Sequence, residues 1–365
     1  MEVKTLVTGG AGFIRTHLGR DLGGRGDEVI VLDSLDSQVH DLAIIVVSHN
    51  DAAWLRPCLS SVFDRVEGLE VDVVVVDNGT DGAADLVERE FPTARVLRLD
   101  NRGFGNANNQ ARSTCASHYV LFLNPDTEVV DGSFPDLIAA LEARPSVGLI
   151  GVRQVTAGGA TLPTIRRFPN AMRALGEAFG SERLPFRTSW LGERELDTSV
   201  YMREVECDWT SGSFMLARQE AFDSAGGFDE RFFLFGEEPD LCLRMRRAGW
   251  EVRHLPWMTI VHHAGRAGID PRMEAQNAFA RRQHALLHFG LSHRIAFLVA
   301  HSIRYGLRAI VLGGGDDRRR RRRMASRWSL KVLWGTANSP FGPPSRQAPR
   351  IDAAPPSTPG QSFEP

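Results

Sequence analysis

The sequence predicts an α/β protein in which helices cover an open sheet. Two β-branched runs, LAIIVVSHN from Leu42 and VDVVVVDNGT from Val71, each end in polar residues. Buried parallel strands have this pattern, and they present their last side chains at the carboxyl edge of a sheet. The segment between the runs spaces its larger apolar residues to fit one buried helical face: Trp54, Leu55, Leu59, Val62 and Phe63. The three segments together predict a βαβ unit.

The alternation of strands and helices continues along the chain. Further strands are expected at ARVLRLD and YVLFLNPD, and a helix is expected at FPDLIAALEAR. Alternation of this kind is typical of an open α/β sheet with helices on its faces. We divide the chain into a short strand–helix–strand fragment (1–38), a main domain (41–270), basic amphipathic helices (271–335) and a proline-rich tail (336–365) that we expect to be disordered.

Composition excludes several classes of protein. Of the 365 residues, 42% are apolar and 24% are charged, and the formal net charge is −2. This balance is typical of a soluble globular protein and argues against a nucleic-acid partner. The four cysteines form no CxxC pair, so neither a zinc site nor a disulfide framework is expected. We see no signal peptide and no run of about 18 apolar residues, so we expect a cytoplasmic protein with at most peripheral membrane contact.

The segment TGGAGFI near the start resembles the phosphate-binding turn of NAD-dependent nucleotide-sugar epimerases and dehydratases. Gly9 and Gly12 fit that turn, and Asp33 ends the next strand, where an acid would hold the ribose. Arg15 stands where the family has a third glycine, which lets the helix pack closely on the strand. The arginine side chain should push the helix off the strand. No tyrosine of the chain has a lysine four positions later, although that pair performs the proton transfer in this family. We therefore interpret residues 1–38 as a vestigial fragment, with NAD binding as the alternative.

Beyond residue 40, several motifs occur together in one known family. They are VVSHN, VVVVDNGTDGAADL, NRGFGNANNQA with YVLFLNPDTEV, the long stretch SGSFMLARQEAFDSAGGFDERFFLFGEEPDLCLRMRRAGW, and VHHAG. In this order, over residues 42–265, the chain resembles family 2 glycosyltransferases of the GT-A fold, and most of all their bacterial rhamnosyltransferase branch. The resemblance implies an open mixed sheet that binds a nucleotide-diphosphate sugar.

Polar residues at the ends of two predicted strands are the candidates for binding the nucleotide. Asp77 is placed to accept a hydrogen bond from a pyrimidine imide N–H, and Ser48 and Asn50 close the preceding strand. The resemblance assigns these residues, with Asn78, to the nucleotide pocket. Asp77 and Asn78 also fit a simple strand-ending turn, because DNGTDG has typical turn residues.

The loop NRGFGNANN supplies further candidates for the donor site. The resemblance assigns Asn101, Gly103 and Asn106 to it. The structural alternative is a glycine-rich loop that runs into a helix, and it explains Gly103 and Gly105 equally well.

LNPDTEV takes the place of the family's metal-binding Asp-x-Asp motif. Asn124 replaces the first acid and Asp126 supplies the second. One carboxylate with waters and phosphate oxygens is a normal ligand set for Mg²⁺ or Mn²⁺, and the ion would offset the charge of a departing diphosphate. The resemblance adds His262 as a ligand, with the adjacent His263 as the alternative. A capping or turn role is the alternative for Asp126.

The general base is expected in GEEPDLCLR. Pro239 suits the first residue of a helix and Gly249 suits its end, so Glu238 is the predicted N-cap of a helix over 239–248. Beside the positive end of the helix dipole, a carboxylate should stay ionised, as a base must. The family usually has aspartate where this chain has Glu238, and Pro239 is a second departure.

Neighbouring residues complete the expected active site. Glu237 is the substitute candidate for the base, and Asp240 is expected to pair with Arg244 four residues later. In CDWTSGSFML, Trp209 is expected to stack on an acceptor sugar or to be a core residue. Gly212 is expected to permit close approach of the donor.

Residues 279–334 alternate arginine and histidine with apolar residues at helical spacing, a pattern that suits helices in a membrane interface. The six consecutive arginines 318–323 would be attracted to anionic lipid headgroups. A solvated charge run on helices packed against the main domain is the alternative.

Together, the residues and the resemblance predict an inverting, metal-dependent glycosyltransferase. L-Rhamnose from dTDP-L-rhamnose is the first donor to test. The resemblance implies a polyprenyl-diphosphate-linked or polysaccharide acceptor of cell-envelope synthesis, at the inner face of the plasma membrane. Because Asn124, Glu238 and Pro239 depart from the family pattern, a catalytically silent glycan-binding protein is an alternative, beside the NAD-dependent epimerase.

Overall fold

The computed structural model describes residues 5–8, 29–32, 39–181, 191–263, 270–310 and 316–342. The chain divides into two compact units, Met1–Val39 and His40–Pro365.

The first unit contains two short strands. β1 (Thr5–Thr8) and β2 (Val29–Leu32) pair in parallel, as the predicted strand–helix–strand fragment requires. The glycine turn, Arg15 and Asp33 lie outside the described residues, so the interpretation of this fragment as vestigial stays a prediction.

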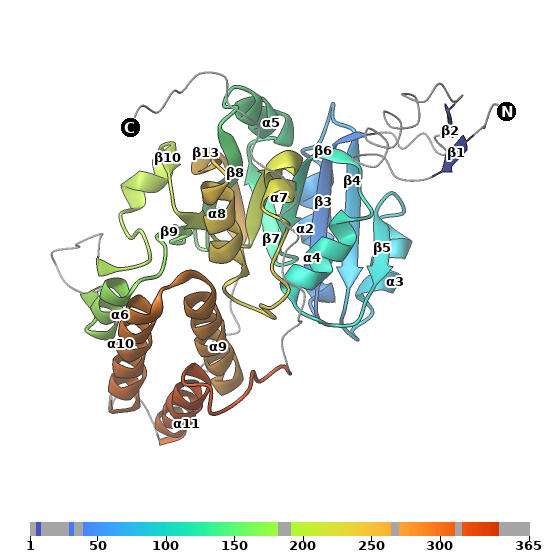
Figure 1. The fold of residues 1–365 in the computed structure, drawn as a ribbon. Coiled ribbons are helices and arrows are strands. Elements are labelled where there is room, and N and C mark those ends of the chain that lie inside the picture. Colours follow the sequence, from blue (N-terminus) through green and yellow to red (C-terminus); the bar gives the residue numbers. More distant parts are fainter. Residues whose placement is uncertain are drawn as a thin grey trace, which may run out of the picture. The chain divides into compact units, whose positions relative to one another are not determined.

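A mixed sheet of nine strands organises the second unit (Figure 1). The strands are β3 (His40–Ser48), β4 (Val71–Asp77), β5 (Arg95–Arg98), β6 (Ser117–Leu123), β7 (Thr127–Asp131), β8 (Val147–Val155), β10 (Val205–Glu206), β12 (Phe214–Arg218) and β13 (Glu251–His262). Their order is β10-β13-β8-β12-β6-β3-β4-β5, and β7 pairs with β13. The β6-β3-β4-β5 half is parallel, whereas β12 lies antiparallel between β6 and β8. The sheet is therefore the open mixed sheet that the sequence predicts.

Helices and a small ribbon surround this sheet. The helices are α2 (Ala52–Phe63), α3 (Ala83–Glu90), α4 (Phe104–Arg112), α5 (Phe134–Glu142), α6 (Ala171–Ala178), the 3-10 helix η3 (Thr198–Met202), α7 (Gln219–Ser224), α8 (Glu237–Arg247), α9 (Pro271–His288), α10 (Leu291–Ile310) and α11 (Asp316–Leu333). The ribbon pairs β9 (Ile165–Arg166) with β11 (Trp209–Thr210) in antiparallel fashion.

The residues of β3 show why both faces of the sheet are covered. Leu42, Ile44 and Val46 pack in one core with residues of α2 and α5. Ala43 and Ile45 pack on the other face with residues of α4, α7 and α8. All five are fully buried. Because successive side chains of a strand point to opposite faces, a strand buried on both faces is apolar throughout.

Three long helices follow the sheet. α9 packs on α11, and α10 packs against α6, α9 and α11. Figure 1 shows the three helices gathered below the sheet in this view. Among the helices that the structure describes, none has both the length and the apolar character needed to cross a membrane.

Candidate active site

Glu238 lies in the first turn of α8. The helix begins at Glu237, and Gly236 is its N-cap, so the prediction that Glu238 caps a helix beginning at 239 is wrong. The physical reason is the backbone of Gly236, whose φ of 90° is left-handed, a conformation that glycine adopts without steric penalty. This reversal ends the preceding loop at Gly236 and places Glu238 inside the first turn, near the unpaired N–H groups of the helix.

The Glu238 carboxylate is held by a neighbouring backbone segment. The N–H of Gly212 donates to Glu238 Oε1, with 3.2 Å between nitrogen and oxygen. A Cβ at position 212 would lie 2.7 Å from the same oxygen. Glycine is therefore needed for this approach. Contact of Gly212 with a donor stays a prediction.

Burial and local charge distinguish the two adjacent glutamates. Glu237 is only 2% exposed, and burial together with the charge of Glu238 raises its pKa well above the ordinary value. Burial also raises the pKa of Glu238, while backbone N–H groups, among them that of Gly212, and the charge of Arg166 limit this increase. Glu238 lines a cavity, whereas Glu237 Oε2 is buried without a hydrogen-bond partner among the described residues. Glu238 is accordingly the better candidate for the base.

The cavity beside Glu238 has a volume of about 300 Å³ and is the candidate acceptor site. Trp209 and Arg166 line it from the β9–β11 ribbon, and Asn277 lines it from α9. Trp209 Nε1 donates to Arg167 O at 3.0 Å, and the ring also packs against the sheet core. The half-buried side chain of Trp209 thus contacts the core and also lines the cavity. Its stacking on an acceptor sugar stays a prediction.

Arg166 is a candidate that the motifs did not reveal. Its guanidinium carbon lies 5.4 Å from the centre of the Trp209 ring, and its Nε has no hydrogen-bond partner among the described residues. Burial and the charge of Arg194 lower the pKa of Arg166, although Glu238 and another acid oppose this. No sequence pattern distinguishes Arg166 from its neighbour Arg167, because only the fold places it beside Glu238.

Asp240 connects α8 to α9. It accepts from Arg244 Nε at 2.9 Å and from Nη2 at 2.6 Å, which confirms the predicted i,i+4 pair. Its other oxygen, Oδ1, lies 2.7 Å from Nε2 of His288. Burial raises the pKa of Asp240, but the hydrogen bond of His288 and the charge of Arg244 outweigh it and hold the pKa below its ordinary value. Because both oxygens have protein partners, Asp240 is the structural member of the three acids.

Asp126 and His262 meet at the edge of the sheet. Asp126 lies between β6 and β7, His262 is the last residue of β13, and Oδ1 and Nε2 are 3.3 Å apart. Burial raises the pKa of Asp126, but the hydrogen bond and charge of His262 bring it below the ordinary value. Neighbouring ligands of an octahedral Mg²⁺ or Mn²⁺ lie about 3 Å apart, so the pair fits one such ion. Among the described residues, His, Cys, Asp and Glu form no group of three or more that would hold a metal, so water and phosphate oxygens would complete the ligand set.

His263, the alternative to His262, has other partners. Its Nε2 lies 2.8 Å from Glu128 Oε2, and its ring stacks on Trp54 with 4.7 Å between the ring centres. The geometry thus favours His262 as the partner of Asp126.

The turn that carries Asp126 is bonded to the segment that carries Gly212. Asn124 N–H donates to Ser213 O at 3.1 Å. Thr127 Oγ1 closes the turn by donating to Asn124 O at 2.8 Å, so the turn predicted as the alternative role is also present. One backbone hydrogen bond therefore connects the turn of the candidate metal ligand Asp126 to the segment that holds the candidate base Glu238.

Ser48 and Asp77 are paired in register at the ends of β3 and β4. Ser48 is fully buried, and its Oγ has no hydrogen-bond partner among the described residues. Asp77 accepts from the N–H groups of Gly79 at 3.0 Å and Ala84 at 2.9 Å. The strand-ending turn is thus present, and the contact of Asp77 with a nucleotide stays a prediction.

Three predicted asparagines lie close to His49, which the sequence reasoning passed over although it belongs to VVSHN. His49 Nδ1 lies 2.9 Å from Asn78 O and 3.3 Å from Asn101 Nδ2. Asn50 has a left-handed φ of 60° and accepts from Thr80 N–H at 2.9 Å. These side chains form a polar edge at the ends of β3 and β4.

Gly103 and Asn106 make their contacts elsewhere. Gly103 has a φ of 102°, and a Cβ there would lie 2.3 Å from Phe233 O. Backbone conformation and packing therefore both require glycine at this position. Asn106 Nδ2 donates to Glu230 Oε2 at 2.8 Å, and its Oδ1 accepts from Gln110 Nε2 at 2.6 Å. The structure supports the role of a loop that runs into a helix, and contact of either residue with the donor stays a prediction.

The open mixed sheet, with these side chains at its edge, defines the GT-A class of glycosyltransferases. The model of the Glycosyl transferase family 2 matches residues 43–205, and the chain belongs to this family. An N-acetylglucosaminyl-diphospho-decaprenol L-rhamnosyltransferase of Mycobacterium tuberculosis is 31% identical over 249 residues, which are 63% of this chain and 78% of that protein. Rhamnosyltransferase WbbL of Escherichia coli is 26% identical over 229 residues, 60% of this chain and 83% of that protein.

A solved structure shows the same fold. The mannosyltransferase PcManGT from Pyrobaculum calidifontis, in complex with GDP-Man and Mn²⁺, superposes with a TM-score of 0.50 at 16% identity, over 82% of this chain and 88% of that one. The fold and the enzyme class predicted from the motifs are confirmed: the chain is a glycosyltransferase similar to rhamnosyltransferases.

Proposed function

We propose that this chain is an inverting, metal-dependent enzyme that moves L-rhamnose from dTDP-L-rhamnose to a hydroxyl of a lipid-linked or polysaccharide acceptor in cell-envelope synthesis. The observation that carries the proposal is the hydrogen bond of 3.1 Å between Asn124 N and Ser213 O. It joins the turn of Asp126 to the segment whose Gly212 holds Glu238. The turn of Asp126, a candidate ligand of the metal that would bind the donor's diphosphate, is thus hydrogen-bonded to the segment that holds the candidate base.

In this proposal Glu238 takes the proton of the acceptor hydroxyl while that oxygen attacks the anomeric carbon of the sugar. The Gly212 N–H orients the carboxylate, and a positioned general base contributes about 10²- to 10⁴-fold to a rate. Attack from the side opposite the diphosphate inverts the anomeric configuration in a single displacement. Mg²⁺ or Mn²⁺, held by Asp126 and His262, would offset the charge of the leaving diphosphate.

The choice of donor and acceptor is supported by the relatives. The mycobacterial and Escherichia coli relatives described above are named rhamnosyltransferases, and the mycobacterial name includes a diphospho-decaprenol acceptor. dTDP-L-rhamnose and a polyprenyl-diphosphate-linked acceptor are therefore the first pair to test. Such an acceptor is anchored in a bilayer, so we place the enzyme at the inner face of the plasma membrane as a peripheral protein.

The test is sugar transfer by the purified chain. The donors are dTDP-L-rhamnose, UDP and GDP sugars, each with and without Mn²⁺, and the acceptor is a short polyprenyl-diphospho-N-acetylglucosamine. We expect transfer from dTDP-L-rhamnose only with the metal, an inverted product, and strong loss of activity in Asp126→Ala and Glu238→Gln. Equal activity of the wild type and both variants would contradict the assigned roles. A different preferred donor would contradict the rhamnose assignment alone.

A further inference from the structure

We propose that α11 carries a site for the phosphate groups of anionic phospholipids, and that this site docks the protein on an anionic bilayer. The proposal deepens the proposed function, on which it rests for the reason to be at a membrane. It concerns a surface that lies apart from the cavity of Glu238: the two cavities have no lining residue in common.

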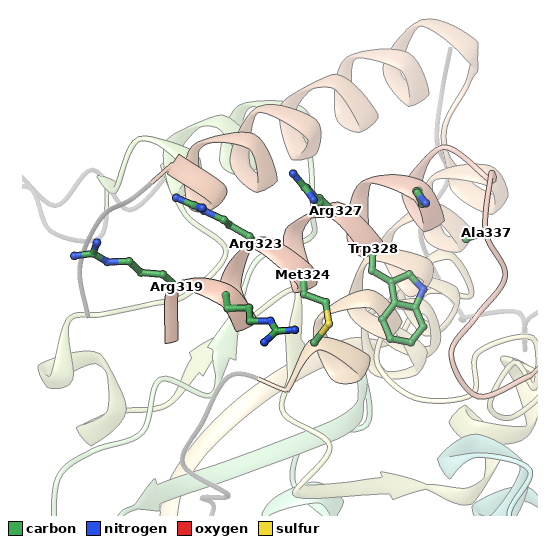
Figure 2. A pocket seen from close by; sticks show the side chains of 8 residues that line it. Arg319, Arg323, Met324, Arg327, Trp328 and Ala337 are labelled. Carbon is green, nitrogen blue, oxygen red and sulfur yellow. The ribbon is translucent and has the colours of Figure 1, made fainter. Parts of the chain in front are cut away.

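The site is a hollow of about 850 Å³ along one side of α11. Its lining consists of Arg319, Arg320, Arg323, Met324, Arg327, Trp328, Lys331 and Ala337. Five of these eight residues are cationic and none is acidic. Arg319, Arg323, Arg327 and Lys331 recur every four residues, which places them on one helical face. Arg320, Met324 and Trp328 form the adjacent row, and Ala337 follows the end of the helix. Figure 2 shows Arg319, Arg323 and Arg327 in a row along the helix, with Met324 and Trp328 beside them.

The chemistry of the lining fits a phosphate at the surface of a bilayer. Guanidinium groups bind phosphate oxygens through two parallel N–H donors. Trp328 adds an aromatic ring of the kind that concentrates at membrane interfaces. The alkyl stems of arginine and lysine pack on apolar surface while their heads stay polar. A headgroup phosphate with acyl chains beside it satisfies both kinds of residue.

The opposite side of α11 holds the helix in place. Ala325, Val332 and Leu333 are fully buried. Val332 packs with residues of α9, and Leu333 packs with residues of α9 and α10. Arg320, Arg323, Arg327 and Lys331 are exposed. The cations are therefore presented by a helix that is already packed, so little backbone ordering opposes binding.

The neighbouring helix α10 exposes an apolar stripe. Leu291, Ile295, Val299, Ile303 and Ile310 are exposed by 71%, 49%, 43%, 37% and 70%. The first four recur every four residues and so lie on one face of the helix. Basic and apolar surface on one bundle of helices is what an anionic bilayer binds. A nucleic acid would gain little from the stripe, and the chain as a whole has a net charge of −2.

The experiment is sedimentation of the full-length protein with vesicles. They consist either of phosphatidylcholine alone or of phosphatidylcholine with about 30% phosphatidylglycerol, which makes the surface anionic. The pocket variant is Arg323→Gln, Arg327→Gln and Lys331→Gln in one chain, because glutamine is a good helix former. The control variant is Arg56→Gln, Arg89→Gln and Arg98→Gln, which removes the same charge from side chains of the main domain that are 61%, 65% and 53% exposed. Thermal melting checks that both variants fold.

We expect binding to anionic vesicles only, weakened by raised salt. Each basic residue near such a surface contributes about fivefold, so the pocket variant should bind on the order of 100-fold more weakly, and the control variant within about twofold of wild type. Ile295→Ser with Val299→Ser should also weaken binding. Equal binding to neutral vesicles, an equal loss in the control variant, or tighter binding to a single-stranded oligonucleotide than to vesicles would overturn the proposal. Vesicle binding without transfer from any donor would leave this site standing while the proposed function fails.

Discussion

The Gly212 nitrogen and Glu238 Oε1 lie 3.2 Å apart, and this hydrogen bond orients the candidate base toward the cavity. The contact needs glycine, because a Cβ at position 212 would lie 2.7 Å from the same oxygen. The next residue, Ser213, accepts the N–H of Asn124 through its carbonyl. A substitution at position 212 therefore affects Glu238 directly. It can also shift the neighbouring Ser213 carbonyl, which holds the turn of Asp126.

Gly212→Ala should reduce catalysis more than stability. The added methyl group must displace the Glu238 carboxylate, and a displacement of about 1 Å in a reacting group can reduce a rate by about 10²-fold. Transfer kinetics should show the loss in kcat, with a smaller change in KM for the donor. Gly158→Ala is the matched control, since a Cβ there would meet only Thr156 Oγ1 at 3.8 Å. Equal kcat values in the two variants would contradict the positioning role.

The pH profile should report the environment of Glu238. Its pKa is raised by burial, so the carboxyl keeps its proton to a higher pH than the ordinary value of 4.5, and the base form is lost earlier as pH falls. We expect kcat/KM to fall on the acid side with an apparent pKa above 4.5. Glu238→Asp should keep the acid limb of the profile, with a lower kcat. Glu238→Gln should show no such limb, and its rate should be about 10²- to 10⁴-fold lower than that of the wild type. An acid limb that persists in the glutamine variant would belong to another group.

The adjacent histidines should differ in metal dependence. His262 lies 3.3 Å from Asp126, whereas His263 is paired with Glu128 at 2.8 Å. His262→Ala should raise the Mn²⁺ concentration needed for half-maximal activity by at least about tenfold, because it would remove one of the two proposed protein ligands. His263→Ala should leave that concentration nearly unchanged. The reverse result would transfer the ligand role to His263.

The motifs were sufficient to predict the sheet. They also named the acids and His262 as candidates, because each belongs to a strand end or helix start with its own local pattern. The structure brings His262 to 3.3 Å from Asp126, and the roles of these residues stay predictions. The start of α8 was misjudged, since Pro239 suits a first helical residue but the left-handed backbone of Gly236 begins the helix earlier. Arg166 and His288 could not be found from the sequence. They reach Glu238 and Asp240 only because β9, α8 and α9, distant in sequence, fold around one cavity.

Arg166 should contribute to binding of an anionic acceptor and to the acidity of the base. It lines the cavity of Glu238, its Nε lacks a hydrogen-bond partner among the described residues, and its charge lowers the pKa of Glu238. Arg166→Gln should raise KM for a diphosphate-linked acceptor about tenfold or more, because a charge-assisted hydrogen bond is lost. KM for a neutral alkyl glycoside should change little. The acid limb of kcat/KM should also move to higher pH. A purely structural role would change neither the selectivity between acceptors nor the limb.

Asp240→Asn should destabilise the fold. Asp240 is 1% exposed and has Arg244 and His288 as partners, and removal of one partner from a buried ion pair costs about 3–5 kcal/mol. Asp85→Asn is the control, because Asp85 is 76% exposed in its pair with Arg98, and exposed pairs contribute about 0–1 kcal/mol.

The pH dependence of this loss has a definite sign. The pKa of Asp240 in the folded chain lies below its ordinary value of 3.8, since His288 and Arg244 outweigh burial. A carboxyl of lowered pKa contributes stability above its unfolded pKa and loses it as pH falls through the folded pKa. Urea unfolding should therefore show the full difference between wild type and Asp240→Asn at neutral pH, and a shrinking difference as the pH falls below 3.8. A difference that grows on acidification would mean that Asp240 is held as the neutral acid, which would contradict its pairing with His288 and Arg244.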